Sequence, residues 1–164
     1  MSATADLYPD EDLRTLVKAR LVDVLTPLLA TAGMAGTAVP VDYGHPGDAM
    51  QREHVFLDQV DGNLDIPLLG RPGEAKQYDD EFSLDVVIAC YRPGNSARDA
   101  ELRVGSLWRL VFTELRTNLQ LGLTAADGLL WVEITRRRGP VSMRTDQGWQ
   151  AVTRATLTFH TRHA

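Results

Sequence analysis

The sequence predicts an α+β fold: a largely antiparallel β-sheet with two helices packed on one face. Two stretches carry apolar residues at helical spacing, and five shorter stretches have the pattern of strands. They follow one another in the order α-β-β-β-α-β-β, so most strands are consecutive. Consecutive strands with hairpin connections pair antiparallel, and both helices need an apolar surface to cover. One sheet with both helices on the same face meets these requirements.

The composition is that of one globular domain, expected over residues 10–164. The chain has 164 residues, 44% of them apolar, and a formal net charge of -5. This acidic balance argues against a surface dedicated to nucleic-acid phosphates. No apolar run approaches the roughly 20 residues of a membrane-spanning helix, and the first residues have no secretory-signal pattern. The single cysteine, Cys90, fits a reducing compartment and is expected to be a small core residue.

The first helix is predicted over residues 10–30, after a flexible tail at residues 1–9. Asp10 suits the N-cap, and the acidic residues that follow it would lie where the helix dipole favours negative charge. Pro27 is expected to end or kink the helix. The predicted core-facing stripe consists of Leu13, Leu16, Val17, Leu21, Val24, Leu25 and Leu28.

Two strands and a long loop should follow. Residues 39–43 form a short strand that Pro40 confines to a sheet edge. Residues 53–60 alternate like a second strand. Residues 61–80 are predicted to be a loop, because glycine, proline and asparagine interrupt the pattern there, and loops of this length are usually functional or disordered.

The best-patterned part of the chain runs from Phe82 to Leu119. Residues 82–91 are predicted to be the central strand, followed by the turn Arg92-Pro93-Gly94-Asn95 and a helix over residues 96–120. The strand would point Phe82, Leu84, Val86 and Ile88 inward. The apolar stripe of the helix consists of Ala97, Ala100, Val104, Leu107, Trp108, Val111 and Leu115.

Two strands are predicted to close the chain, over residues 129–137 and 149–160. The connection at residues 138–149 is expected to be a long hairpin that projects from the sheet as an arm. The inward side chains of the first of these strands would be Leu130, Val132 and Ile134.

No catalytic, cofactor or metal site is predicted. The chain has no G-x-S-x-G, S-x-x-K, Walker or dinucleotide-binding pattern. Its histidines fall outside metal-ligand spacings and are expected to be solvated or edge-strand residues: His45, His54, His160 and His163. The sequence therefore predicts a protein that is not an enzyme and binds no cofactor.

An acidic cluster, Asp79, Asp80 and Glu81, precedes the central strand. Neighbouring carboxylates can perform acid–base chemistry or bind a cation. Residues adjacent in sequence at the start of a strand point in different directions, however, and no complementary base is in view. We expect a solvated or partner-facing acidic turn.

A basic triplet, Arg136, Arg137 and Arg138, ends a predicted strand, and Arg144 and Arg154 could lie nearby across the hairpin. One interpretation is a patch that contacts DNA. The acidic chain favours the alternative, a charged sheet edge that prevents aggregation or pairs with an acidic neighbour.

The long loop carries apolar side chains outside any regular element: Leu64, Ile66, Leu68 and Leu69. Residues of this kind cover their own core or dock on another chain. Together with the projecting arm, they favour partner binding over catalysis. The candidate interface residues are therefore these four, the acidic cluster, the basic triplet and Arg144.

The pattern and order of these segments resemble tail terminator (tail completion) proteins of long-tailed bacteriophages. The resemblance rests on the helix at residues 13–28, the segment Val39-Pro40-Val41-Asp42-Tyr43-Gly44 with the strand at 53–60, and the closing strand pair. It also includes the strand at 81–91 that leads through Arg92-Pro93-Gly94 into the second helix. It covers most of residues 10–160.

The resemblance implies a structural virion protein that forms a homo-hexameric ring. Such a ring caps the head-proximal end of the tail tube, stops its polymerisation and joins tail to head. The implied partners are further copies of the chain, the tail tube protein and a head–tail connector or stopper protein. Genomic DNA would pass through the lumen without sequence-specific binding. The implied location is the tail or neck of the virion, assembled in the host cytoplasm, with no membrane and no catalytic residues.

Three alternatives stay open. One is another connector protein of the head–tail neck. A small cytosolic α+β ligand-binding domain or enzyme would need polar groups in a pocket between the second helix and the sheet, where the predicted side chains are apolar. A DNA-binding module conflicts with the net charge and with the lack of a basic recognition helix.

Overall fold

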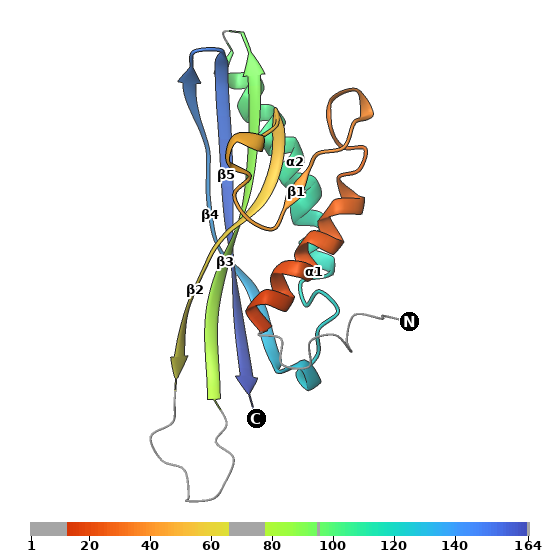
Figure 1. Cartoon of the computed structure of the whole chain (residues 1–164), viewed down its shortest axis with the longest axis vertical. Helices are drawn as coiled ribbons and strands as arrows, with labels where there is room; N and C mark the ends of the chain where they lie inside the picture. The colour runs from red at the N-terminus through yellow and green to blue at the C-terminus, as the bar shows by residue number, and fades with distance from the viewer. Residues whose placement is uncertain (1–12, 66–77, 95, 164) are drawn as a thin grey trace, which may run out of the picture.

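The computed structural model describes residues 13–65, 78–94 and 96–163 (Figure 1). The main elements follow the predicted order and confirm the α+β class. They are α1 (Leu13–Leu28), β1 (Val41–Asp42), β2 (Glu53–Asp65), β3 (Tyr78–Pro93), α2 (Ala97–Thr117), β4 (Leu129–Thr145) and β5 (Gly148–His163). Short 3-10 helices lie at Met34–Gly36, Gly47–Ala49 and Ala125–Asp127.

The five strands form one sheet in the order β1-β2-β3-β5-β4. β1 runs parallel to β2, and all other neighbours are antiparallel. β3 is the central strand, as predicted, and β1 lies at an edge directly after Pro40. Figure 1 shows both helices on the same side of the sheet, so no helix of the described residues covers the other side.

The core lies between the helices and the covered face of the sheet. The inward residues predicted for the central strand are all buried, as is nearly all of the α2 stripe. In α1 every fourth residue is buried: Leu13, Val17, Leu21 and Leu25. Ser96 caps α2, because its Oγ accepts a hydrogen bond from the backbone N–H of Asp99 at 3.2 Å. No helix among the described residues has the length and apolar character to cross a membrane.

The loop predicted over residues 61–80 is shorter than expected. β2 continues to Asp65 and β3 begins at Tyr78, so most of both flanks are paired strand. Gly62 lies opposite Phe82, and a Cβ on Gly62 would be only 2.6 Å from the Cβ of Phe82. Glycine, which weakens an isolated strand, here permits close packing in the ladder. Residues 66–77, including Ile66, Leu68 and Leu69, lie outside the described residues.

The projecting arm predicted at residues 138–149 is wrong. β4 continues to Thr145 and pairs with β5 up to the turn at residues 146–147. Gly148 also pairs with Pro93, so this end of the hairpin is level with the end of β3. Gly139 and Pro140 are accommodated in a β-bulge between Arg138 and Val141.

A second bulge changes which leucine of β4 is buried. The register shifts between Leu129 and Trp131, so Leu129 lies in the core and Leu130 is 38% exposed. The prediction that Leu130 points inward is therefore wrong, whereas Val132 and Ile134 do pack against the core. A bulge adds one residue to a strand and breaks the strict alternation on which the prediction depended.

Candidate interaction surface

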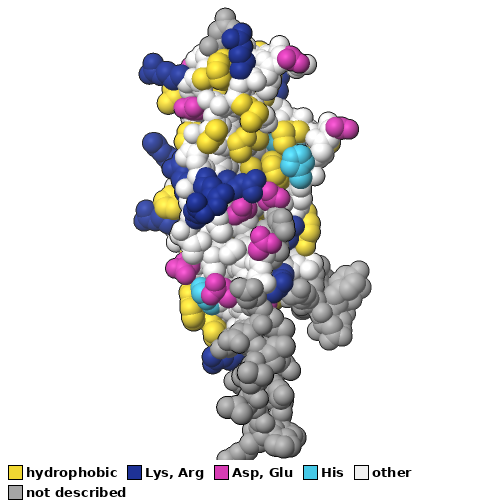
Figure 2. All heavy atoms as spheres, turned by 90° about the vertical axis from the view of Figure 1, so that its left-hand side faces the viewer, with side chains coloured by type: hydrophobic (Ala, Val, Ile, Leu, Met, Phe, Trp, Pro, Cys, Tyr) yellow, Lys and Arg dark blue, Asp and Glu magenta, His cyan; other side chains and the backbone are white. Residues whose placement is uncertain are grey.

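The face of the sheet that no helix covers presents charged and apolar side chains together. Figure 2 shows this face: hydrophobic side chains gather in the upper part, Lys and Arg side chains cross the middle, and Asp and Glu side chains lie below them. We refer to it as the open face. Its β4 residues, identified from their partners on β5, are Trp131, Glu133, Arg136, Arg138, Val141 and Met143.

A bulge between Ile134 and Arg136 divides the basic triplet between the two faces. Arg136 and Arg138 lie on the open face, whereas Arg137 lies opposite Ala155 on the helix side. The Arg137 guanidinium is 4.9 Å from the ring centroid of Trp108 in α2, a cation–π contact. The three arginines are therefore not one basic patch.

The two arginines on the open face lie beside a third that is fully paired. Arg154 lies directly opposite Arg138 and binds Asp58 at 2.8 Å and Asp85 at 3.0 Å. Partial burial lowers the pKa of Arg154, but hydrogen bonding to Asp85 and the charges of both carboxylates raise it overall. Together these residues line an open hollow of about 420 Å³.

Arg136 and Arg138 are exposed, and no carboxylate in the described part of the chain lies within ion-pair distance of either guanidinium. Arg154 has its charge balanced within the fold. The charges of Arg136 and Arg138 are thus available to another molecule.

Apolar residues extend this surface toward the turn between β4 and β5. Val141 is 63% exposed and Met143 is 57% exposed. They lie next to a small buried cluster on the same face, formed by Phe56, Val87 and Ala89. A contiguous apolar area of this kind on an otherwise polar face is typical of a contact surface.

The opposite end of the open face is aromatic and acidic. Trp131 stacks on His160 with ring centroids 4.2 Å apart, and it remains 51% exposed. The two nitrogens of His160 each lie 3.3 Å from a carboxylate, Glu81 for Nδ1 and Glu133 for Nε2.

Arg144 does not join the other arginines. It lies opposite Trp149, on the helix side of the sheet, near Gly94 and the turn between β4 and β5. The expected proximity across the hairpin holds for Arg154 and fails for Arg144, because the strand alternation places Arg144 on the other face.

The acidic cluster is not a turn but part of β3. Asp80 is buried and binds the Arg14 guanidinium of α1 through both carboxylate oxygens, at 2.8 and 2.9 Å. Glu81 lies on the open face and is exposed, so adjacent carboxylates do point in different directions. A partner-facing role is wrong for Asp80, since it holds a helix on the sheet. The side chains of Asp79 and Leu64 lie outside those described.

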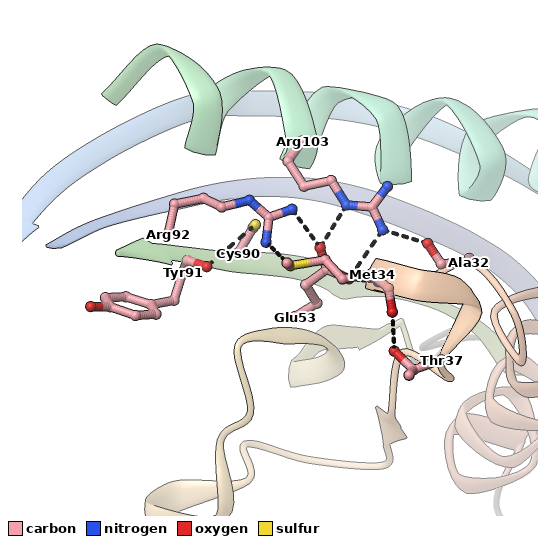
Figure 3. Close-up of polar contacts among 8 residues, drawn as sticks. All are labelled: Ala32, Met34, Thr37, Glu53, Cys90, Tyr91, Arg92 and Arg103. Carbon is pink, nitrogen blue, oxygen red and sulfur yellow. Dashed lines mark hydrogen bonds and ion pairs between the residues drawn. The ribbon is translucent and has the colours of Figure 1, made fainter. Parts of the chain in front are cut away.

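The sequence analysis missed a buried cluster around Glu53. Figure 3 shows Arg92 and Arg103 converging on its carboxylate, Arg92 from β3 and Arg103 from α2. Arg103 Nε donates to Glu53 Oε1 at 2.6 Å, and Arg92 Nη2 donates to the same oxygen at 2.9 Å. Arg103 also donates to the carbonyl of Ala32, and the backbone N–H of Met34 donates to Glu53 Oε2 at 3.2 Å.

This cluster joins α2, β2, β3 and the segment after α1. Burial raises the pKa of Glu53, but the hydrogen bonds and charges of Arg103 and Arg92 hold it below its ordinary value. Arg92 and Arg103 are 39 and 50 residues away from Glu53 in the sequence. No local pattern could have identified them, so a structural lock of this kind is visible only in the folded chain.

Cys90 is buried beside this cluster. Burial raises the pKa of its thiol, so the group stays protonated and is a poor nucleophile. It packs with Ala100, Val104 and Ala151, as expected for a small core residue.

His160 departs from the prediction of solvated or edge-strand histidines, because its side chain is 18% exposed and it lies in β5, between β3 and β4. The second exception is His54. It is only 2% exposed; its Nδ1 accepts a hydrogen bond from the backbone N–H of Gln51, and its Nε2 lies 2.5 Å from Asp42. The pair links β1 to β2 and explains why a two-residue strand stays on the sheet. Among the described residues, no three acidic, histidine or cysteine side chains are grouped to hold a metal ion.

Comparison with known proteins adds no family. No protein-family model matches the chain, and no curated protein matches it in sequence.

Proposed function

We propose that this chain is a structural subunit of a bacteriophage virion, a tail terminator. Six copies would form a ring that caps the head-proximal end of the tail tube, stops its polymerisation and joins the tail to the head. The observation that carries the proposal is the open face, where Arg136 and Arg138 have no ion-pair partner among the described residues and lie beside exposed Val141 and Met143. The order of elements, which resembles that of tail terminators, adds to it.

The core supports a role without catalysis. An active site needs polar groups that converge in an enclosed pocket. Between α2 and the sheet, Leu84, Leu107 and Val111 are fully buried and pack against one another in one apolar cluster. The described hollows lie at the surface instead, as at Arg154 and its carboxylates. A ligand-binding domain or enzyme is therefore the weaker alternative, and no cofactor is proposed.

The mixed charge of the open face favours protein partners. Asp58, Asp85, Glu81 and Glu133 lie on the same face as the arginines. Such a face would repel a continuous phosphate backbone along much of its length, whereas a protein can present both charges. The proposed partners are further copies of this chain, the tail tube protein and a connector or stopper protein, while DNA passes the ring without specific contacts.

Light scattering across a concentration series, with negative-stain images of the same samples, tests the ring. We expect particles with a central hole and a mass near six times the 18.1 kDa of the chain. Assembling tail tubes in the presence of the protein should then give tubes capped at one end. A monomer at every concentration that also fails to cap tubes would overturn the proposal.

Two further measurements separate the alternatives. Another connector of the neck would bind heads and leave tube polymerisation unchanged. A DNA-binding module would bind a short duplex with an affinity that falls steeply with salt. We expect no steep salt dependence, because the open face carries both charges.

A further inference from the structure

We propose that one row of exposed side chains on the open face binds an extended segment of a partner protein, in which basic, acidic and apolar residues follow in that order. We refer to this row as the β4 row, and it consists of Trp131, Glu133, Arg136, Arg138, Val141 and Met143. The inference rests on the proposed function, which makes the open face a contact surface, and it names the chemistry of the partner there. The spacing, the exposure and the charges of the row support it.

The β4 row is evenly spaced in the sheet, although its members are not evenly spaced in the sequence. Their partners on β5 follow at regular steps of two residues: His160, Thr158, Thr156, Arg154, Val152 and Gln150. Each step is about 6.7 Å, twice the rise of one strand residue. An extended segment laid along the row would present every second side chain at the same spacing.

Two bulges of β4 produce this regularity. Strict alternation from Trp131 would bring Arg137 to the open face. The first bulge brings Arg136 and Arg138 there instead, and the second keeps the two apolar members of the row on the same face. Bulges are frequent next to functional sites, where they re-aim side chains. The regular row is thus a feature of the folded strand that suits recognition.

The aromatic and acidic end of the row fits a cationic side chain. Trp131 stacks on His160 and is still about half exposed. Glu133 is the next member of the row, Glu81 lies beside His160 on β3, and both carboxylates are more than half exposed. Indole binds cations best among the aromatic rings, and a carboxylate beside it adds ionic attraction. A lysine or arginine of the partner would use both.

The middle of the row fits acidic side chains. Arg136 and Arg138 occupy successive steps and are exposed, and no carboxylate of the described residues forms an ion pair with them. The charge of Arg154, which lies beside them, is already balanced by Asp58 and Asp85. A guanidinium can bind a carboxylate through two parallel hydrogen bonds. Each of the two exposed arginines can therefore hold one acidic residue of the partner.

The last two members of the row fit apolar side chains. Val141 and Met143 are both more than half exposed, and they lie next to the small buried cluster of the same face. Methionine adapts its shape to different apolar partners, and covering both residues would remove apolar surface from water. The complementary segment therefore presents basic, acidic and then apolar side chains at alternate residues.

Two other occupants match the row less well. A second copy, turned by a two-fold rotation, could set its aromatic and acidic end against the two arginines. Its apolar members would then extend past the first residue of the row and stay uncovered. A nucleic-acid backbone would suit only the two arginines, and Glu133 would repel it. The order of chemistries along the row therefore favours a segment of another protein.

The test uses labelled peptides and fluorescence anisotropy. The first peptide, Lys-Thr-Lys-Thr-Glu-Thr-Glu-Thr-Leu-Thr-Leu, presents basic, acidic and apolar side chains at alternate positions. The second has the same residues in reverse order, because the row does not fix the direction of the segment. We expect saturable binding of one of the two. One additional threonine between its acidic and apolar parts would turn the leucines away from the face and should weaken binding about tenfold.

Charge variants provide the matched measurement on the protein. Arg136→Gln/Arg138→Gln should weaken binding of the preferred peptide about tenfold, and raising the salt concentration should reduce this difference. Arg109→Gln/Arg116→Gln removes two exposed arginines from α2 and should bind like the wild type. Arg136→Glu/Arg138→Glu should instead prefer a peptide with lysines in place of the glutamates. A purely structural role of the two arginines would not exchange the specificity in this way.

Failure of both peptides to bind, or equal binding by the two glutamine variants, would overturn the inference. Dimers of the wild type that the glutamine variant of the row abolishes would show that a second copy occupies the face, which would also overturn it. Capping of tail tubes by a protein that binds neither peptide would leave the terminator proposal standing. Peptide binding by a protein that neither forms rings nor caps tubes would support the row and reject the terminator.

Discussion

Two clusters of arginines and carboxylates in this protein have the same chemistry and different surroundings. Around Glu53, two arginines bind a carboxylate that is only 7% exposed, and they also tie down the segment after α1. Around Arg154, one arginine is balanced by Asp58 and Asp85 at the surface. In that second cluster Arg136 and Arg138 are exposed, and no carboxylate of the described residues forms an ion pair with them. Burial thus makes the first cluster a structural lock and leaves the second available for recognition.

The largest expected effect comes from breaking the buried cluster. Glu53→Gln should lower the free energy of unfolding by about 3 kcal/mol, because Arg92 and Arg103 would keep their charges without a partner. Urea denaturation followed by circular dichroism measures it. The exposed Glu133→Gln is the control and should change stability by less than about 0.5 kcal/mol. Equal effects would mean that burial does not distinguish the two clusters.

The next effect compares two neighbours in β3 that face opposite sides of the sheet. Asp80→Asn should cost about 2 kcal/mol, since Arg14 of α1 loses a buried, bidentate partner. Glu81→Gln, one residue further on the open face, should cost less than about 0.5 kcal/mol. Hydrogen exchange should also become faster in α1 for Asp80→Asn alone. An unchanged α1 would show that apolar packing suffices to hold the helix.

Lowering the pH should remove part of the stabilisation that Glu53 provides. The pKa of Glu53 in the folded state lies below its ordinary value of 4.5, so the folded state binds this proton less readily than the unfolded state does. The stabilisation from Glu53 is therefore complete above about pH 4.5 and is lost as the pH falls through the lower, folded-state pKa. The difference in unfolding free energy between wild type and Glu53→Gln should narrow below about pH 4.5. A constant difference down to pH 3 would contradict this sign.

The smallest expected effect tests the surface cluster. Arg136→Gln/Arg138→Gln should change the free energy of unfolding of the monomer by less than about 0.5 kcal/mol, because neither guanidinium has an ion-pair partner among the described residues. Thermal melts at low protein concentration measure it. A large loss of stability would assign these arginines to the fold and remove them from the proposed contact.

Some errors of the sequence analysis have a common physical cause. The projecting connection predicted at residues 138–149 and the inward position of Leu130 both assume strands without bulges. A bulge depends on pairing with β5, which local composition does not encode. The sequence analysis placed Gly62 in a loop for a similar reason. Its close approach to Phe82 depends on the pairing of β2 with β3, which local composition does not encode.

By itself, the sequence determined the α+β class, the order of elements, the central strand and the buried stripes of α1 and α2. These depend on the periodicity of apolar residues over one turn or one strand, which is a local property. Only the tertiary structure decided that Arg137 lies on the opposite face of the sheet from Arg136 and Arg138. It also decided that Asp80 binds Arg14 and that Glu53 binds two arginines. Bulges and ion pairs between residues 39 to 66 positions apart create these arrangements, and both exist only once the strands have paired.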